Sequence, residues 1–371
     1  MRGKIKTMKL VETSGSALDM GRAQGALTIE NWAKSVELLK SSKLPRGVED
    51  LIAEYCPKQL VRMLGIARGV GVELDEVLAM CVSEIRATRV EYYFGACSTF
   101  ALKGGLSPDK SPVIAQNFDF PEGFSELSIT RISRPEKGLS SIDITLGPLS
   151  GSYGGVNEKG LAVTYNRGYA IDKPSSPMPI TMLVQELLER FETTEDAINF
   201  VANAPRGLSA LLMIADREGD VAAIELSPHY SGVRRPDGDV IYQTNHYHTP
   251  QMAAIDMPRK AYYSDKMPEA LRGERVREST DERYERLTDL FKDPQPMNSS
   301  DIKKVLGDHG KERTPWTTPF AGMVHSTAHP RALLSTRASP VSKSRGDTPA
   351  KANSSTLPFN IPINRRNPEY V

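Results

Sequence analysis

The sequence predicts an α+β fold in which two antiparallel sheets are stacked between layers of helices. Three observations predict it. The chain of 371 residues begins with helical periodicity, two separate groups of short strand-like runs follow, and a helical stretch comes after each group. Because a sheet has to bury its apolar face against another layer, this order is typical of stacked sheets covered by helices.

The helical pattern comes first and covers residues 18–95. The stretch ALDMGRAQGALTIENWAKSVELLK has an amphipathic period, and further helices are separated at Pro57 and around Gly69–Gly71. Residues 97–168 are then rich in strands, which glycine, proline and aspartate separate from one another. These predicted strands read CSTFAL, VIAQNFDF, LSITRIS, SIDITL, GGVNE and LAVTYN.

The second half of the chain repeats this alternation. Two helices are predicted in ITMLVQELLERF and TTEDAINFVANA, and we expect Thr194 to cap the second of them. Strands return in SALLMIADREGDVAAIEL, which contains an Arg-Glu-Gly-Asp turn, and in DVIYQTNHY. Residues 253–310 are again helical in pattern and highly charged. From about residue 326 the chain is polar and rich in proline, so we expect an extended or poorly ordered tail.

The most informative residue is Cys97, in the segment YYFGACSTFALKGGLSPDKSPVIAQNFDF. The pattern predicts a hairpin with this thiol at the start of its first strand and Asp119 on its second. A cysteine inside a chain is ordinarily a small buried apolar residue. It becomes a candidate nucleophile if the peptide bond before it is broken, because the freed α-amine can act as its general base. The amine titrates near ~8 and a thiol near ~8.5, so a proton can pass between them at neutral pH.

Five motifs in chain order support that chemistry through a family resemblance. Besides the segment around Cys97 they are MGRAQGALTIENW, GGVNEKGLAVTYNRG, YQTNH, and STDERYERLTDLF with the following IKKVLGDHG. Together they resemble the cysteine N-terminal-nucleophile hydrolases of the penicillin (isopenicillin N) acyltransferase family, over roughly residues 15–325. The resemblance implies the αββα sandwich of that family and self-cleavage between Ala96 and Cys97. The family most often has glycine where this chain has Ala96.

The resemblance also implies roles for four further residues. Asp119 would hold the α-amine of Cys97, since a carboxylate favours and orients a neighbouring ammonium. Asn166 and Asn245 follow predicted strands at positions where the family has asparagines that orient the oxyanion or the amine. Each of them is equally a residue type common in Asx turns. Arg283 would lower the pKa of the thiol or bind a substrate carboxylate; the alternative is an arginine on a solvated helix.

Other chemistries find little support in the sequence. His246 and His248 have the spacing of two residues on one strand face, but no cysteine or carboxylate cluster accompanies them, so no metal is expected. Neither a phosphate-binding glycine loop nor a G-x-S-x-G elbow is present, and we expect no cofactor. The net charge of +1 and the absence of a basic aromatic-rich run argue against nucleic acid as a partner.

The composition fits a protein of a reducing compartment. Hydrophobic residues make up 39% of the chain, which is enough for a sizeable core, and no run of 18 apolar residues predicts a membrane span. Three widely spaced cysteines argue against a disulfide framework. No secretory signal is recognised at the start, so we expect a cytoplasmic location.

We therefore expect a helical N-terminal segment over residues 1–96, a catalytic core over 97–325 and a tail over 326–371. The favoured function is a self-processing amidohydrolase or acyltransferase that acts on a linear C–N amide through a Cys97 thioester, with its two fragments remaining associated. A bile-salt-hydrolase-like or ceramidase-like amidase is a variant of this hypothesis. The competing class is a non-catalytic αββα binding protein that is never cleaved.

Overall fold

The computed structural model describes residues 8–39, 44–86, 97–118, 124–173, 176–263, 265, 272–308, 321–326 and 331–335. The helices of this part are α1 (Ala17–Thr28), α2 (Trp32–Leu39), α3 (Val48–Tyr55), α4 (Pro57–Val70), α5 (Leu74–Cys81), α6 (Ser83–Arg86), α7 (Phe124–Leu127), α8 (Ile180–Arg190), α9 (Thr194–Asn203), α10 (Pro250–Ala253), α11 (Glu278–Leu290) and α12 (Ser299–Leu306). The strands are β1 (Lys9–Gly15), β2 (Cys97–Leu102), β3 (Val113–Phe118), β4 (Ser128–Pro135), β5 (Ser141–Leu146), β6 (Gly154–Asn157), β7 (Ala162–Arg167), β8 (Ala210–Ala215), β9 (Val221–Leu226), β10 (Ser231–Arg234), β11 (Val240–Gln243), β12 (Ala321–Ser326) and β13 (Arg331–Ser335).

These strands form two sheets. The larger sheet has eight strands in the order β1-β4-β5-β6-β7-β8-β9-β10, and the smaller has five in the order β11-β2-β3-β12-β13. Neighbouring strands run antiparallel except for β1 and β4, which are parallel. The predicted strands CSTFAL and SIDITL coincide residue for residue with β2 and β5, because alternating apolar positions and flanking turns mark both ends.

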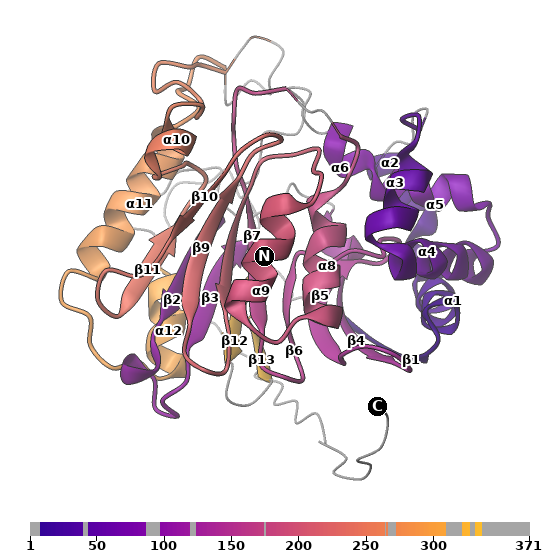
Figure 1. Ribbon diagram of the computed structural model, residues 1–371, viewed down its shortest axis with the longest axis horizontal. Coiled ribbons are helices and arrows are strands. Elements are labelled where there is room, and N and C mark those ends of the chain that lie inside the picture. Colours follow the sequence, from indigo (N-terminus) through magenta and orange to yellow (C-terminus); the bar gives the residue numbers. More distant parts are fainter. Residues whose placement is uncertain are drawn as a thin grey trace, which may run out of the picture.

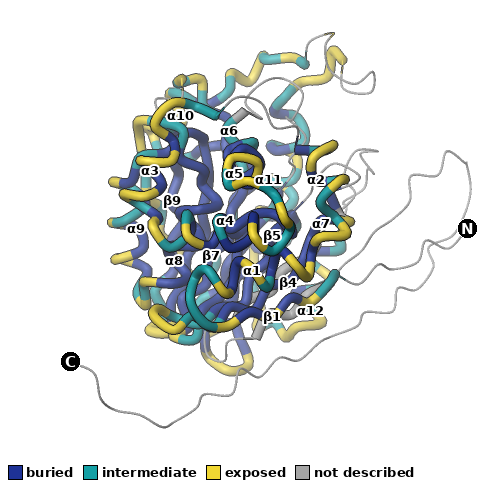
Figure 2. Tube along the Cα trace, turned by 90° about the vertical axis from the view of Figure 1, so that its right-hand side faces the viewer, coloured by how far each residue is buried: buried dark blue, intermediate teal, exposed yellow. Residues whose placement is uncertain are grey.

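The two sheets are stacked face to face, with helices on both outer faces. Between them lies an apolar cluster that includes Ala101 and Ile114 from the smaller sheet and Ile142 and Met213 from the larger. Helices α11 and α12 cover the outer face of the smaller sheet, and α8 and α9 cover that of the larger (Figure 1). Figure 2 shows the strands as the buried interior and the helices as partly exposed. This is the αββα arrangement, and the predicted fold class is confirmed.

The N-terminal helices gather at one side of the molecule, beside β1 and β4 (Figure 1). Here α1 crosses α4 at close range because glycines face each other. A Cβ atom added at Gly65 would lie 2.3 Å from the carbonyl oxygen of Leu18, and one added at Gly21 would lie 2.1 Å from that of Arg62. The G-x-x-x-G spacing of α1 is therefore a requirement of this helix crossing.

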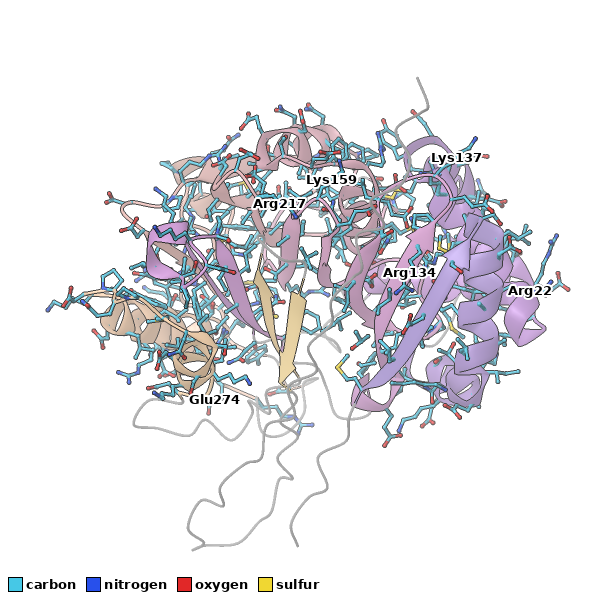
Figure 3. The ribbon with its side chains drawn as sticks, turned by 90° about the horizontal axis from the view of Figure 1, so that it is seen from below. Arg22, Arg134, Lys137, Lys159, Arg217 and Glu274 are labelled. Atoms are coloured by element: carbon cyan, nitrogen blue, oxygen red, sulfur yellow. The ribbon has the colours of Figure 1, made fainter. Side chains whose placement is uncertain are left out.

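Two fully buried arginines fix this side of the molecule to the larger sheet. Arg62 of α4 donates to Ser133 at 2.8 Å and pairs with Glu189 of α8 at 3.4 Å. Arg131 of β4 donates to the side-chain oxygen of Gln24 in α1 at 3.2 Å and pairs with Asp143 of β5 at 3.0 Å. Other charged side chains, such as those labelled in Figure 3, project from the outside of the ribbon. Within the described residues, no helix has both the length and the apolar character needed to cross a membrane.

The structure corrects the prediction for the first residues and for the second helical pair. β1 was not expected, since only Val11 and Thr13 of KLVETSG are buried and the alternation is too short to stand out. The N-terminal segment is thus helical with an added edge strand. The cap of α9 is Thr193, whose hydroxyl accepts from the amide of Asp196, and Thr194 is the first residue of the helix. The predicted cap was one residue late.

Three further differences lie toward the C-terminus. The short edge strand β10 was not expected. The described residues of the stretch expected to be helical after α10, namely 254–263, 265 and 272–277, are largely turns with two isolated bridges, and Pro258 and Gly273 explain why no helix continues through them. Residues 331–335 belong to the predicted polar tail, but they form β13 at the edge of the smaller sheet. Its backbone pairs antiparallel with β12. Residues 336–371 lie outside the described residues.

Candidate active site

Cys97 is the first residue of β2, at one end of the smaller sheet, and it is buried. Successive residues of a strand point to opposite faces, so Cys97 and Thr99 share a face. The hydroxyl of Thr99 donates to Asn166 of the larger sheet at 2.6 Å, and this face of β2 therefore looks toward the other sheet. The thiol sits where the space between the two sheets begins.

The neighbouring strand β11 brings Asn245 to this point. The β11–β2 ladder pairs Gln243 with Thr99, and continuing that antiparallel register by two residues sets Asn245 beside Cys97. Its side-chain oxygen Oδ1 accepts a hydrogen bond from the backbone nitrogen of Cys97 at 3.0 Å. Its Nδ2 donates to the carbonyl oxygen of Arg167 at 2.9 Å. The amide group is thus held at both ends, with its acceptor directed at the nitrogen of Cys97.

Arg283 of α11 closes the cluster from the outer layer. Its Nη1 donates to the carbonyl oxygen of Cys97 and, at 3.0 Å, to the hydroxyl of Ser98. Its Nη2 donates to Oδ1 of Asn245 at 2.8 Å. Arg286, three residues further on the same helix, instead pairs with Asp308 through two hydrogen bonds of 2.9 and 2.7 Å. The two arginines of this motif therefore have different environments, and Arg283 is the one at the cysteine.

Asn166 lies between the sheets, and its side-chain amide hydrogen-bonds to other buried groups of the protein. Its Oδ1 accepts from Thr99 at 2.6 Å and from Gln116 at 2.7 Å, and its Nδ2 donates to the carbonyl oxygen of Thr244 at 2.9 Å. These bonds tie β7 to β2, β3 and the end of β11. The side chain therefore supports the loop that carries Asn245, and its Nδ2 donates to Thr244 and not to Cys97.

Two parts of the predicted site lie outside the described residues. They are Asp119 and the pair Gly95-Ala96 that precedes Cys97. The β2–β3 ladder pairs Cys97 with Phe118, the residue that precedes Asp119 in the sequence. The predicted hairpin is present up to that point, and the role of Asp119 stays a prediction.

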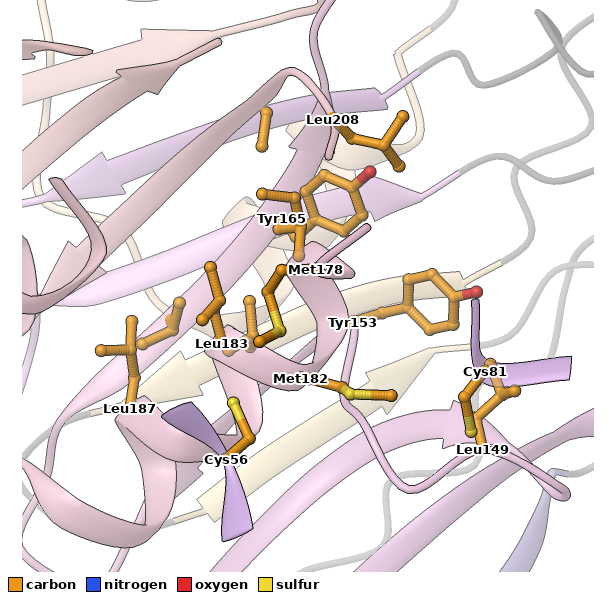
Figure 4. Packing of buried hydrophobic residues seen from close by; sticks show 14 of the residues in the cluster. Cys56, Cys81, Leu149, Tyr153, Tyr165, Met178, Met182, Leu183, Leu187 and Leu208 are labelled. Carbon is orange, nitrogen blue, oxygen red and sulfur yellow. The ribbon is translucent and has the colours of Figure 1, made fainter. Parts of the chain in front are cut away.

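Aromatic residues lie next to Cys97. The rings of Phe118 and Tyr153 have centroids 5.0 Å apart, and Tyr153 stacks on Tyr165 at 6.2 Å with an angle of 8° between the ring planes. Figure 4 shows both tyrosines in the apolar cluster that also contains Cys81 and Cys56. Burial raises the pKa of both tyrosines and of both of these cysteines, that of Cys81 to about 11. Cys56 and Cys81 are therefore inert thiols of the core.

His246 follows Asn245, and its ring packs beside the hydroxyl groups of Thr244 and Thr280. Its Nδ1 lies 3.2 Å from the hydroxyl of Thr244 and 3.1 Å from that of Thr280, and its ring packs against His248 with centroids 4.5 Å apart. Burial, assisted by the charge of Arg277, lowers the pKa of His246 to about 3, so the ring is neutral at neutral pH. No group of three or more metal-ligating side chains occurs in the described part of the chain. Thr280 lies in the motif STDERYERLTDLF three residues before Arg283, but its residue type alone did not predict a role at the site.

Several known proteins are similar to this chain. An uncharacterized protein of Archaeoglobus fulgidus is 22% identical over 302 residues, and the match covers 66% of this chain and 51% of that protein. The chain thus spans about half the length of the curated relative that it matches.

Solved structures similar to the chain include three hydrolases. An ortholog of N-acylethanolamine-hydrolyzing acid amidase from Caenorhabditis elegans is 12% identical, with a TM-score of 0.46 over 63% of this chain and 94% of its own. A variant of conjugated bile acid hydrolase from Clostridium perfringens is 12% identical, with a TM-score of 0.44 over 65% and 89%. Penicillin V acylase from Agrobacterium tumefaciens is 14% identical, with a TM-score of 0.40 over 66% and 84%.

A sequence family described as acyl-coenzyme A:6-aminopenicillanic acid acyl-transferase matches residues 106–327. The match starts after Cys97, and it contains Asn166, Asn245 and Arg283. It extends over well over half of the chain. The chain therefore belongs to the acyl-coenzyme A:6-aminopenicillanic acid acyl-transferase family.

Proposed function

We propose that the protein is a self-processing amidohydrolase or acyltransferase in which Cys97 becomes an N-terminal nucleophile. The observation that carries the proposal is the contact between the backbone nitrogen of Cys97 and Oδ1 of Asn245, at 3.0 Å. A nitrogen that is already held by a side-chain acceptor is positioned to become an oriented α-amine once the preceding peptide bond is cut. An amine held beside its own thiol supplies the general base that amide chemistry requires.

Processing would proceed by an N-to-S acyl shift. The thiolate of Cys97 attacks the carbonyl carbon of Ala96, the C–N bond breaks, and the nitrogen takes up a proton to become the α-amine. Water then hydrolyses the thioester, which frees the carboxylate of Ala96 and the thiol of Cys97. The cation of Arg283 next to Cys97 and Ser98 favours the thiolate that begins the sequence.

The mature enzyme would repeat the same chemistry on a substrate amide. The α-amine takes the thiol proton, the thiolate attacks the substrate carbonyl, and the departing amine takes that proton as the C–N bond breaks. A thioester on Cys97 remains, and water or an acceptor amine resolves it with the α-amine again acting as base. A small N-acyl amide or N-acyl amino acid is the substrate class that fits this scheme.

The surrounding residues divide the remaining tasks. Asn245 orients the amine through Oδ1, and Asp119 supplies a carboxylate that favours the ammonium. The fork of Arg283 is occupied by protein oxygen atoms, which favours a role in tuning the thiolate over one in binding a substrate carboxylate. Asn166 acts indirectly, by fixing the carbonyl of Thr244.

The two fragments would remain together after cleavage. Strand β1 of the N-terminal fragment pairs with β4 along its whole length. Gln24 of α1 donates to the carbonyl oxygens of Gly147 and Leu149 at 2.9 and 2.8 Å, and Arg62 reaches Ser133 and Glu189 of the other fragment. Separation would leave these buried groups without partners, which costs more than their bonds contribute.

Acylation of Cys97 by a panel of N-acyl compounds tests the proposal. Purified protein is incubated with N-acyl amino acids and N-acyl p-nitroanilides, and the fragment that begins at Cys97 is examined by mass spectrometry. We expect a mass increase equal to the acyl group, absent in Cys97→Ala and retained in the matched control Cys81→Ala. Protein that stays at full length and shows neither acylation nor turnover with any member of the panel would support the non-catalytic binding protein instead. Processed protein that shows neither would contradict the proposed amide chemistry.

A further inference from the structure

We infer that Thr280 is a positioning residue that holds Asn245 against the nitrogen of Cys97. This inference rests on the proposed function and adds to it a residue of the STDERYERLTDLF motif for which the sequence predicted no role. Thr280 lies in the first turn of α11 and is 3% exposed. Its hydroxyl touches neither Cys97 nor Arg283 in the contacts described above, so its action on the nucleophile passes through Asn245.

The hydroxyl of Thr280 makes a closed set of hydrogen bonds with the end of β11. Its oxygen accepts from the backbone N–H of Asn245 at 2.8 Å, and its proton goes to the hydroxyl oxygen of Thr244 at 2.8 Å. The hydroxyl of Thr244 in turn donates to the carbonyl oxygen of Thr280 at 3.0 Å. Residues 244 and 245 are therefore fixed to α11 by three bonds that all involve Thr280.

Two residues of helix α11 hold Asn245. Thr280 and Arg283 are three residues apart and so lie on one helical face. Thr280 holds the backbone of Asn245, and Arg283 holds its side-chain oxygen at 2.8 Å. The oxygen that Arg283 fixes is the one that accepts from the nitrogen of Cys97. Both bonds are needed to set the position of that oxygen, because one fixes the strand and the other the side chain.

His246 closes the opposite side of the hydroxyl pair. Its Nδ1 lies within 3.2 Å of both Thr244 and Thr280, and its ring packs edge-on against Tyr284, with centroids 5.2 Å apart. The two hydroxyls are buried in this packing, with Thr244 at 0% exposure. Water therefore has no easy access to replace the Thr280 hydroxyl if it is removed.

Proton transfer requires donor and acceptor within roughly 2.6–3.2 Å, and a displacement of about 1 Å can reduce a rate about 100-fold. Thr280→Val keeps the shape of the side chain but leaves the N–H of Asn245 unpaired. We expect self-cleavage and kcat to fall about 10-fold to 100-fold, with KM changed by less than about threefold. Thr280→Ser keeps the hydroxyl and should stay within about threefold of the natural protein.

The experiment compares Thr280→Val, Thr280→Ser and the control Thr288→Val. Thr288 is an exposed residue of the same helix whose hydroxyl bonds Tyr242 and the carbonyl of Tyr284. The rate at which freshly synthesised precursor becomes two fragments is measured on gels, together with kcat and KM for an N-acyl p-nitroanilide. Thermal unfolding is recorded for each variant. If Thr280→Val does not fold, Thr280→Ala replaces it. Alanine also removes the hydroxyl but has a smaller side chain, and Thr280→Ser remains the comparison that keeps the hydroxyl.

The possible results distinguish a failure of the positioning role of Thr280 from a failure of the proposed Cys97 chemistry. Slow cleavage in Thr280→Val with rescue by serine, in folded protein, supports the positioning role. Cleavage and kcat at the natural rate in the folded valine or alanine variant overturn that role while leaving the nucleophile intact. A general loss in which Thr280→Ser is as slow as Thr280→Val also overturns it. If the natural protein is not cleaved, or if Cys97→Ala still is, the proposed function fails and the inference fails with it.

Discussion

The side-chain oxygen of Asn245 accepts a hydrogen bond of 3.0 Å from the backbone nitrogen of Cys97. The two residues are 148 positions apart in the chain, and the register between β11 and β2 brings them together. Arg283 contacts both of them from a third element, α11. The nitrogen, its acceptor and a cation are therefore assembled at the start of β2.

Arg283→Lys is expected to impair the enzyme severely. Lysine has no planar fork and cannot hold the carbonyl of Cys97, the hydroxyl of Ser98 and Oδ1 of Asn245 together. We expect kcat/KM to fall about 100-fold, as for the loss of a positioned charged donor. The matched control is Arg286→Lys, which should remain within a fewfold of the natural rate because Arg286 contacts Asp308. Equal effects of the two substitutions would remove Arg283 from the mechanism.

Asn166→Leu is expected to act chiefly on stability. The substitution leaves the buried groups of Thr99, Gln116 and Thr244 without their partner, and unfolding in urea should show a loss of about 3 kcal/mol. Asn203→Ala, at an exposed helix end, serves as the control and should change stability by less than about 0.5 kcal/mol. A stable but inactive Asn166→Leu protein would assign this residue to the chemistry instead.

Gly65→Ala tests the crossing of α1 and α4. The added methyl would lie 2.3 Å from the carbonyl oxygen of Leu18, so the helices must separate. We expect a loss of about 1–3 kcal/mol in the free energy of unfolding. Gly105→Ala is the control, since its added Cβ would meet nothing within 4 Å. Unchanged thermal unfolding of the Gly65 variant would show that the helices are not so closely packed.

His248 makes stability depend on pH. Burial and the charge of Arg234 lower its pKa to about 3, while an unfolded histidine titrates near ~6.5. Between these values the unfolded chain binds the proton and the folded chain does not, so acid favours unfolding. The contribution is complete above pH ~6.5 and is lost as the pH falls toward 3, by at most about 1.4 kcal/mol per pH unit.

His248→Phe isolates this effect from the other titrating groups, since phenylalanine keeps a ring against His246 and Tyr284. Buried carboxyl groups such as Asp256, whose pKa is raised to about 6, change stability in the opposite direction in both proteins. The urea midpoint of His248→Phe should therefore rise relative to that of the natural protein as the pH is lowered from 7 to 4. Parallel pH curves for the two proteins would contradict the account.

Strands with strong apolar alternation were predictable from the sequence, and weak edge strands were not. β2 and β5 were located to the residue, and α8 and α9 to within about one residue at most ends. β1 pairs with β4 and β13 pairs with β12, and pairing between strands that are distant in the sequence leaves little mark in the local pattern.

The candidate site was predictable as a set of residues but not as a geometry. The motifs pointed to Cys97, Asp119, Asn166, Asn245 and Arg283. The structure brings Cys97, Asn245 and Arg283 into contact, and Asp119 lies outside the described residues. That Asn166 bonds away from the cysteine, and that Thr280 holds the loop, follow from the register of strands and the placement of α11. These are contacts between distant parts of the chain, which no local pattern encodes.

If self-cleavage takes place, Cys97 becomes the first residue of a new chain. N-terminal sequencing of the purified protein shows directly whether it does. Cleavage divides the 40.9 kDa chain into fragments of about 10 and about 30 kDa. We expect the larger fragment to begin Cys-Ser-Thr and Cys97→Ala to give one uncut chain. A natural protein that stays at full length, or a larger fragment that begins at any other residue, would contradict this expectation.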